Sequence, residues 1–94
     1  MPFLEIKSPF GNKRLELEES PITIGRLPEC AVMLSDTNVS RHHAEVRPDG
    51  PRFRVFDLGS TNGTFVNGTR VTSHALSDGD VITVGSTKIT FEAN

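Results

Sequence analysis

Apolar and polar residues alternate along most of the chain. In residues 3–7, Leu4 and Ile6 fall on one face of an extended segment, whereas Glu5 falls on the other. A period of two places every second side chain on the same side of a β-strand, so this pattern predicts strands with one face on a core. The segments expected to form strands are residues 3–7, 14–18, 22–24, 32–34, 44–47, 52–58, 64–66, 69–71, 81–84 and 87–92.

Turn-forming residues separate these segments at intervals of roughly ten residues. Asn67-Gly68 is the most characteristic turn, since this dipeptide favours the tight connection of a β-hairpin. No segment of about eleven residues repeats its apolar positions with the period of a helix. The sequence therefore predicts an all-β fold, an antiparallel β-sandwich of about ten to eleven short strands.

Length and composition restrict the chain to one small domain, which we place at residues 1–94. The formal net charge of −2 argues against a protein that binds nucleic acid by neutralising many phosphates. No apolar run approaches the roughly 18 residues of a membrane span, and no secretory signal is evident. We therefore expect no membrane contact and a cytoplasmic or otherwise intracellular location. Cys30 is the one cysteine, which excludes an intramolecular disulfide.

Two polar stretches rich in glycine and asparagine lie between residues 36 and 68. The first contains Ser40 and the second contains Thr61, while Arg26 follows an earlier predicted strand. Rigid strands commonly hold functional loops at one end of a sheet, so we expect a recognition surface there. A phosphate dianion requires convergent donors, preferably with one fixed positive charge. The guanidinium and the two hydroxyls meet that requirement and form a candidate phosphate site.

Three motifs, in their order and spacing, resemble the forkhead-associated (FHA) domain, a phosphothreonine-peptide binding module. They are Gly25-Arg26, the run Ser40-Arg41-His42-His43, and the stretch from Ser60 to Gly68, and the likeness continues into LSDGDVITVG. The resemblance implies that Arg26, Ser40 and Thr61 contact the phosphate. It also implies that Asn62 grips the main chain of an extended peptide. Arg41 brings a second charge to this site, for the phosphate or for the peptide backbone.

Four further positions are expected to support the loops rather than to bind the ligand. Gly25 and Gly63 are interpreted as turn glycines. The resemblance assigns His43 the part of a brace, hydrogen-bonded between the two recognition loops. Asn67 is expected to support its own turn.

Two other kinds of site are disfavoured by the sequence. Ser40, His43 and Asp57 offer a hydroxyl, a base and an acid, but Ser40 lacks the G-x-S-x-G elbow and the chain is too small to enclose a substrate. A metal site built from His42, His43 and His74 is unfavourable because adjacent residues of a strand point to opposite faces. We expect neither an enzyme, nor a metal, nor a cofactor.

The predicted function is therefore phosphothreonine-dependent binding in phosphorylation-regulated signalling by Ser/Thr kinases. The expected partner is a protein or peptide that contains phosphothreonine. FHA domains are commonly appended to other domains, so a place within a larger protein is compatible with this chain. The alternative is a scaffold or self-association module that works without phosphate, since sandwich faces and edge strands also pair with partners.

Overall fold

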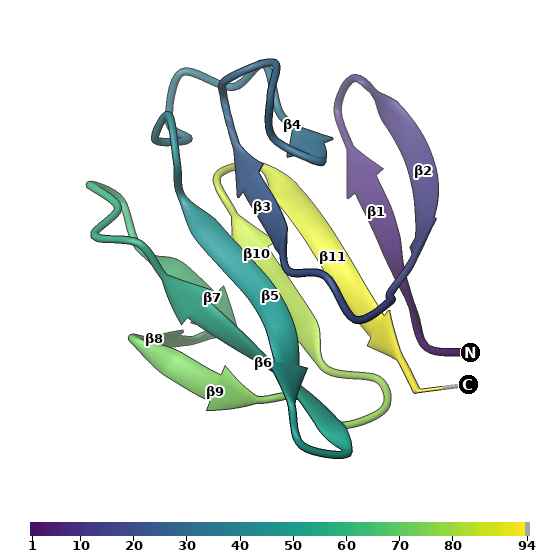
Figure 1. Ribbon diagram of the computed structural model, residues 1–94. Coiled ribbons are helices and arrows are strands. Elements are labelled where there is room, and N and C mark those ends of the chain that lie inside the picture. Colours follow the sequence, from purple (N-terminus) through teal and green to yellow (C-terminus); the bar gives the residue numbers. More distant parts are fainter. Residues whose placement is uncertain (94) are drawn as a thin grey trace.

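The computed structural model describes residues 1–93, which form two β-sheets and no helix (Figure 1). The eleven strands within that range are β1 (Phe3–Ser8), β2 (Gly11–Glu16), β3 (Ile22–Gly25), β4 (Val32–Met33), β5 (Ala44–Asp49), β6 (Arg52–Asp57), β7 (Thr64–Val66), β8 (Thr69–Val71), β9 (Ser73–Ala75), β10 (Val81–Val84) and β11 (Thr87–Glu92). The predicted all-β sandwich of ten to eleven strands is confirmed. Over the same residues, nothing has the helical length and apolarity needed to span a membrane.

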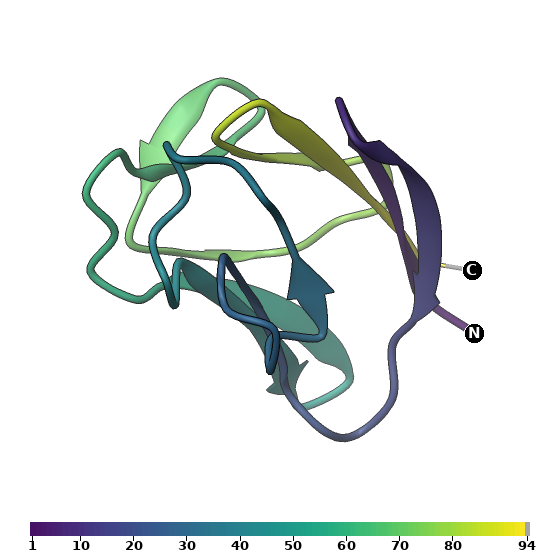
Figure 2. The ribbon, with the colours of Figure 1, turned by 90° about the horizontal axis from the view of Figure 1, so that it is seen from above.

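The two sheets face each other as layers (Figure 2). The larger sheet has the order β2-β1-β11-β10-β7-β8, and the smaller has the order β4-β3-β5-β6-β9. Among the pairings described for residues 1–93, β3 with β4 is parallel and the others are antiparallel. The parallel pair departs from the predicted antiparallel arrangement. Apolar alternation reports which face of a strand is buried, and it carries no information about strand direction.

β9 lies outside the segments expected to form strands. Its sequence, Ser73–Ala75, contains no apolar alternation. The strand exists because it pairs with β6, where Val55 stands opposite His74. This element depends on a tertiary contact that local sequence does not encode.

β2 begins and ends earlier than the expected segment 14–18. Ser8 pairs directly with Gly11, so the turn between β1 and β2 consists of two residues. Leu17 is buried beyond the end of the strand, and its N–H donates to the carbonyl of Pro2 at 2.9 Å. The apolar pattern correctly marked Leu17 as inward, but it did not mark where strand pairing stops.

The core lies between the sheets and is assembled from apolar side chains of eight of the described strands and of the segments that connect them. Its buried members are Leu4, Ile6, Leu17, Ile24, Val32, Leu34, Val39, Ala44, Val46, Val55, Val66, Leu76, Ile82, Val84, Ile89 and Phe91. A close-packed interior of this kind holds the strand ends in fixed positions. The loops after β3, β4 and β6 gather at one end of the sandwich, and the start of β1 and the end of β11 lie at the other (Figure 1).

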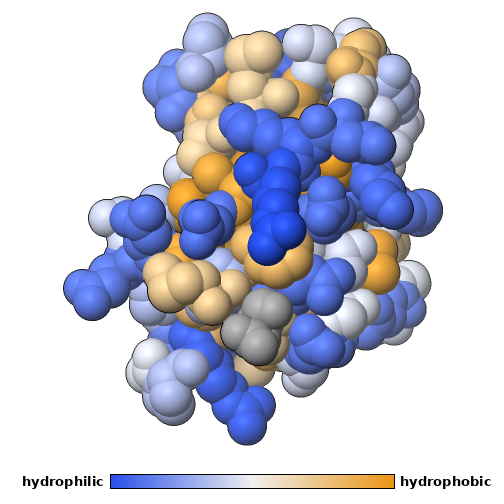
Figure 3. All heavy atoms as spheres, turned by 90° about the vertical axis from the view of Figure 1, so that its right-hand side faces the viewer, coloured by the Kyte–Doolittle hydropathy of each residue, from blue (hydrophilic) through white to orange (hydrophobic). Residues whose placement is uncertain are grey.

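The side of the sandwich formed by β1 and β2 carries a mixed surface. Hydrophilic side chains cover much of this side and leave the apolar surface in separate patches (Figure 3). The guanidinium of Arg14 lies 3.5 Å from the centre of the Phe3 ring, so it covers part of that aromatic face. β2 is an edge strand, and Lys13 and Arg14 make it a poor template for pairing with another strand.

Candidate functional site

A small recess lies between the loops that follow β3, β4 and β6. Its volume is about 150 Å³, and its lining residues are Arg26, Thr37, Asn38, Val39, Ser40, Thr61 and Asn62. The fold thus brings together four of the residues singled out from the sequence, namely Arg26, Ser40, Thr61 and Asn62. They come from three loops that start at rigid strand ends, as expected for a site on a sandwich.

The loop after β3 places Arg26 under close restraint. Gly25 is buried, and a Cβ atom at this position would collide with the carbonyl oxygen of Arg41. This close approach lets the Arg26 N–H donate to the carbonyls of Ser40 and Arg41, each at 3.1 Å. The Arg26 Nε–H donates to the carbonyl of Val39 at 2.8 Å. Within residues 1–93 the terminal nitrogens of Arg26 have no hydrogen-bond partner, so they are available to an anion.

Ser40 and Thr61 are joined by a direct hydrogen bond. The backbone N–H of Thr61 donates to Ser40 Oγ at 3.1 Å. A hydroxyl that accepts in this way still has its own proton to donate, and the bond fixes the oxygen in place. The contact therefore sets the Ser40 hydroxyl as a donor at the edge of the recess.

Asn62 is tied across the recess to the loop that carries Ser40. Its Nδ2 donates to the carbonyl of Asn38 at 2.9 Å. The amide side chain has two donor hydrogens and one acceptor oxygen, so this bond leaves Oδ1 and one hydrogen for a ligand. Such a pair matches the N–H and C=O groups of an extended peptide.

His43 links the two recognition loops from below and is fully buried. Its Nδ1 accepts the backbone N–H of Ser40 at 3.1 Å, and its Nε2 lies 2.8 Å from the carbonyl oxygen of Gly63. These partners require the neutral ring with the proton on Nε2. Gly63 has φ +95°, and a Cβ there would lie 2.8 Å from Arg70 Nε, so both its backbone conformation and the covering side chain demand glycine.

Asp57 organises the loop after β6. Its carboxylate accepts the backbone N–H groups of Gly59 and Ser60 and the hydroxyls of Ser60 and Thr64. Burial raises the pKa of this carboxyl, but the hydrogen bonds from Ser60, Thr64 and Gly59 outweigh it and hold the pKa below its ordinary value. The ionised carboxylate thus holds the backbone of this loop in place through these hydrogen bonds.

Asp36 plays the same part in the loop after β4, and sequence reasoning missed it. Its carboxylate accepts the N–H of Asn38 and, from a distant turn, the N–H of Ser86, each at 2.9 Å. These two bonds lower the pKa of the Asp36 carboxyl. Gly85 has φ +59°, and a Cβ there would lie 2.6 Å from Asp36 Oδ2 and 2.8 Å from Val39 Cγ2. The turn between β10 and β11 therefore packs against Asp36 and Val39 in the loop that carries Ser40.

Two of the predicted residues, Arg41 and Asn67, do not line the recess. Arg41 lines a neighbouring, larger recess with Leu27, Ser40, His42 and Leu58. Asn67 lies in the β7–β8 hairpin, where its side chain bonds Asp80 Oδ1 and the N–H of Val81, both at 3.0 Å. Asn67 has φ +51°, the left-handed conformation that asparagine tolerates in a tight hairpin turn.

The contacts of Ser40, His43 and Asp57 do not form a catalytic triad. Both ring nitrogens of His43 bond backbone groups, and the Asp57 carboxylate is occupied by Ser60, Thr64 and Gly59. In the described part of the chain, no cluster of three or more His, Cys, Asp or Glu side chains is arranged to hold a metal ion.

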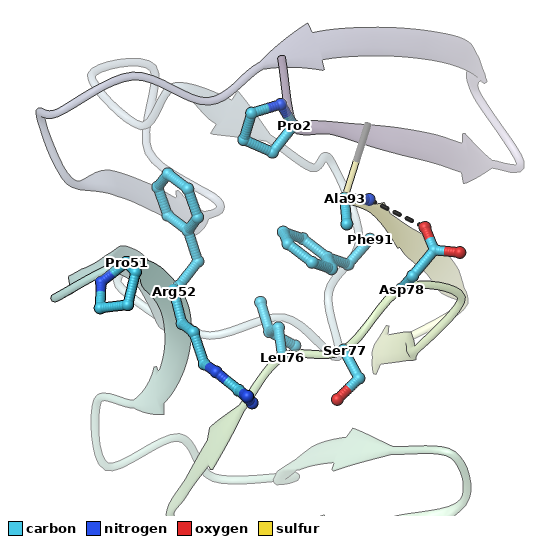
Figure 4. Close-up of a pocket in the computed structure, with 9 residues that line it drawn as sticks. Pro2, Pro51, Arg52, Leu76, Ser77, Asp78, Phe91 and Ala93 are labelled. Carbon is cyan, nitrogen blue, oxygen red and sulfur yellow. Dashed lines mark hydrogen bonds between the residues drawn. The ribbon is translucent and has the colours of Figure 1, made fainter.

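The opposite end of the sandwich has a different kind of hollow (Figure 4). It has a volume of about 420 Å³, and its lining residues are Pro2, Pro51, Arg52, Phe53, Leu76, Ser77, Asp78, Phe91 and Ala93. The rings of Phe53 and Phe91 pack 6.2 Å apart with a tilt of 51°. Aromatic and aliphatic side chains line most of this hollow, together with Arg52, Ser77 and Asp78, whereas the recess at the loop end has mainly polar side chains in its lining.

Taken together, the fold and the three tied loops define a β-sandwich module with a polar ligand recess at one end. The FHA domain family model matches residues 22–85. Glycogen accumulation regulator GarA of Mycolicibacterium smegmatis is 39% identical over 85 residues, which are 90% of this chain and 54% of GarA. The chain therefore belongs to the FHA domain family, and it spans about half the length of that regulator.

Two solved structures agree with this assignment. The FhaA FHA domain, complexed with the intracellular domain of Rv3910, is 38% identical and has a TM-score of 0.89, with 98% of this chain and 100% of that chain covered. A structure from an analysis of phosphothreonine-dependent FHA domain interactions is also 38% identical, with a TM-score of 0.86 and coverage of 98% and 97%. Both likenesses cover 98% of this chain.

Proposed function

We propose that this domain binds phosphothreonine peptides of partner proteins and thereby mediates phosphorylation-regulated association. The observation that carries the proposal is the convergence of Arg26, Ser40 and Thr61 on one recess of about 150 Å³. A guanidinium and two hydroxyls match a phosphate dianion in charge and in hydrogen-bonding pattern. Membership of the FHA family and the 38% identity to a domain studied for phosphothreonine-dependent interactions support the same ligand.

In this mechanism each group has a separate task. The terminal nitrogens of Arg26 bind the phosphate oxygens, and the bond from Nε to Val39 keeps the guanidinium in place. The Ser40 hydroxyl donates a further hydrogen bond, because its oxygen is already held by Thr61. Asn62 aligns the peptide backbone beside the phosphate. Because these groups are held by intramolecular bonds before the ligand arrives, little ordering entropy is lost on binding.

The domain itself performs no chemistry on the peptide in this proposal. Its contribution is regulated recognition, with a Ser/Thr kinase supplying the phosphate that completes the ligand. One relative is named a glycogen accumulation regulator and another an oxoglutarate dehydrogenase inhibitor, and both names describe a regulatory function. We infer a comparable regulatory place for this module.

The direct test is a calorimetric titration with matched peptides that differ only in phosphorylation of one threonine. We expect the phosphorylated peptide to bind and the unphosphorylated peptide to bind at least tenfold more weakly, the loss expected when charged hydrogen bonds are removed. Equal affinity for the two peptides would reject the proposal in favour of a phosphate-independent scaffold.

A further inference from the structure

A second, larger recess adjoins the candidate phosphate site. Its volume is about 440 Å³, and its lining residues are Leu27, Ser40, Arg41, His42 and Leu58. Ser40 lines both this recess and the smaller one that contains Arg26. A peptide held by its phosphate at Ser40 therefore has neighbouring residues within reach of the second recess, since an extended chain advances only about 3.3 Å per residue.

The walls of this recess combine apolar surface with one uncommitted positive charge. Leu58 is 41% exposed, although it is a large apolar side chain, and Leu27 is half-buried. The Arg41 guanidinium has no hydrogen-bond or ion-pair partner within residues 1–93. His42 differs from Arg41, because its Nε2 already lies 3.6 Å from a carboxylate oxygen of Glu29.

The main chain of Arg41 is fixed even though its side chain is free to meet a ligand. Its carbonyl oxygen accepts the N–H groups of Arg26, at 3.1 Å, and Leu27, at 3.4 Å. The same residue thus connects the loop of the phosphate site to the wall of the larger recess. The anchored main chain keeps the base of the Arg41 side chain beside the recess, while the guanidinium stays available to a ligand.

We propose that this recess binds the side chain of a glutamate that flanks the phosphothreonine in the partner. The carboxylate pairs with Arg41, and the two methylenes of the glutamate cover Leu27 and Leu58. An apolar stem with an anionic end matches both parts of the wall, which neither a lysine nor a leucine side chain does. This assignment rests on the proposed function, because binding of the phosphate at Ser40 holds the flanking glutamate of the same peptide close to the recess.

The test moves one glutamate along a phosphothreonine peptide with otherwise neutral flanks. Each of the three positions on either side of the phosphothreonine carries glutamate in one peptide and glutamine in its pair. At one position we expect the glutamate peptide to bind wild-type protein about two- to fivefold more tightly, as for a partly exposed ion pair. In Arg41→Gln this preference disappears, and in Leu58→Ala it is reduced.

Arg52→Gln is the matched control, because it removes the same charge from an exposed arginine at the other end of β6. It should keep the glutamate preference. If Arg41→Gln weakens glutamate and glutamine peptides equally, Arg41 is a phosphate ligand and the subsite is wrong. The subsite is equally wrong if no position shows a glutamate preference while phosphate dependence persists. If phosphorylated and unphosphorylated peptides bind alike, the proposed function itself fails.

Discussion

The two ends of the sandwich are held together by different forces. At the loop end, Asp36, His43 and Asp57 fix the backbone through hydrogen bonds, and few apolar side chains are involved. At the opposite end, Phe53, Leu76 and Phe91 pack around a hollow whose lining also includes Arg52, Ser77 and Asp78. The difference separates recognition from stability. Changes at one end should alter ligand affinity, and changes at the other should alter the free energy of unfolding.

The largest expected effect on stability is that of Leu76→Ala. Leu76 is 3% exposed, and truncating such a side chain in a core costs about 2–5 kcal/mol of unfolding free energy. Affinity for a phosphopeptide, measured where the variant remains folded, should not change. Because the chain has no Trp or Tyr, urea denaturation is best followed by far-ultraviolet circular dichroism. Leu76→Met is the volume-conserving control, and a loss of affinity in folded Leu76→Ala would show that the two ends are coupled.

Arg26→Ala should have the reverse effect. Losing the charged hydrogen bonds to phosphate should cost about 1.5–3 kcal/mol of binding free energy, roughly ten- to hundredfold in affinity. The unfolding free energy should fall by no more than about 1.5 kcal/mol, since a single, part-buried bond to the Val39 carbonyl is lost. Calorimetry and denaturation of the same protein give both values. Arg52→Ala is the control for loss of a positive charge, at the end of the sandwich opposite the recess. If Arg26→Ala binds the phosphopeptide with unchanged affinity, Arg26 is not part of the phosphate site.

Gly85→Ala tests the support behind the loop end. The left-handed backbone costs an alanine about 1–2 kcal/mol, and the added Cβ must also displace Asp36 or Val39. We expect lower stability together with a severalfold loss of phosphopeptide affinity. Gly68→Ala is the matched control, because Gly68 has φ +85° and no atom lies within 4 Å of a Cβ built there. Equal affinities of the two variants would show that Asp36 does not act on the recess.

Folding and phosphate binding should depend on pH over different ranges. The pKa values of Asp36, Asp57 and Asp80 are lowered on folding, so their stabilisation persists above the unfolded value near 3.8 and is lost only as pH falls through the lower folded values. The phosphate has a second pKa of about 6, so affinity should fall by up to about tenfold between pH 7.5 and pH 5 while the fold persists.

Titrations at both pH values, with circular dichroism as the check on folding, measure this separation. His43→Gln is the control for the protein, because it replaces the imidazole whose Nδ1 accepts the Ser40 N–H. Constant affinity across this range in the wild type would count against a site selective for the dianion.

The smallest expected effect is the preference for phosphothreonine over phosphoserine in one peptide. The ligands differ by one methyl group, whose burial between the Ser40 loop and the Thr61-Asn62 loop is worth about 0.8 kcal/mol. The stiffer χ1 of threonine adds to this by lowering the entropy lost on binding, so we expect a preference of at least severalfold. A competition assay with the two phosphopeptides measures it. If the two phosphopeptides compete equally, the proposed burial of the methyl group is wrong, whereas recognition of the phosphate is unaffected.

The sequence predicted the all-β sandwich, and it also singled out His43 as a link between the two recognition loops, but it missed Asp36. Alternation placed Leu4 and Ile6 inward, and the Asn67-Gly68 dipeptide marked its hairpin. The segment Asp36-Thr37-Asn38 has the sequence of an Asx turn, in which the aspartate side chain bonds a backbone N–H two residues later. The sequence therefore contained a local indication of this contact. The second partner of the Asp36 carboxylate, Ser86, lies 50 residues away in the sequence, so no local pattern predicts this hydrogen bond. β9 and the direction of β4 were missed for the same reason, because each depends on a neighbour brought in by the fold.

The placement of the chain ends has a practical consequence for using this domain as a reagent. The start of β1 and the end of β11 lie at the side of the sandwich away from the loops after β3, β4 and β6 (Figure 1). A tag or a surface attached there leaves the recess facing the solution. Immobilised in this way, the domain should capture phosphorylated peptides from a digest on a column, and free phosphothreonine peptide should elute them.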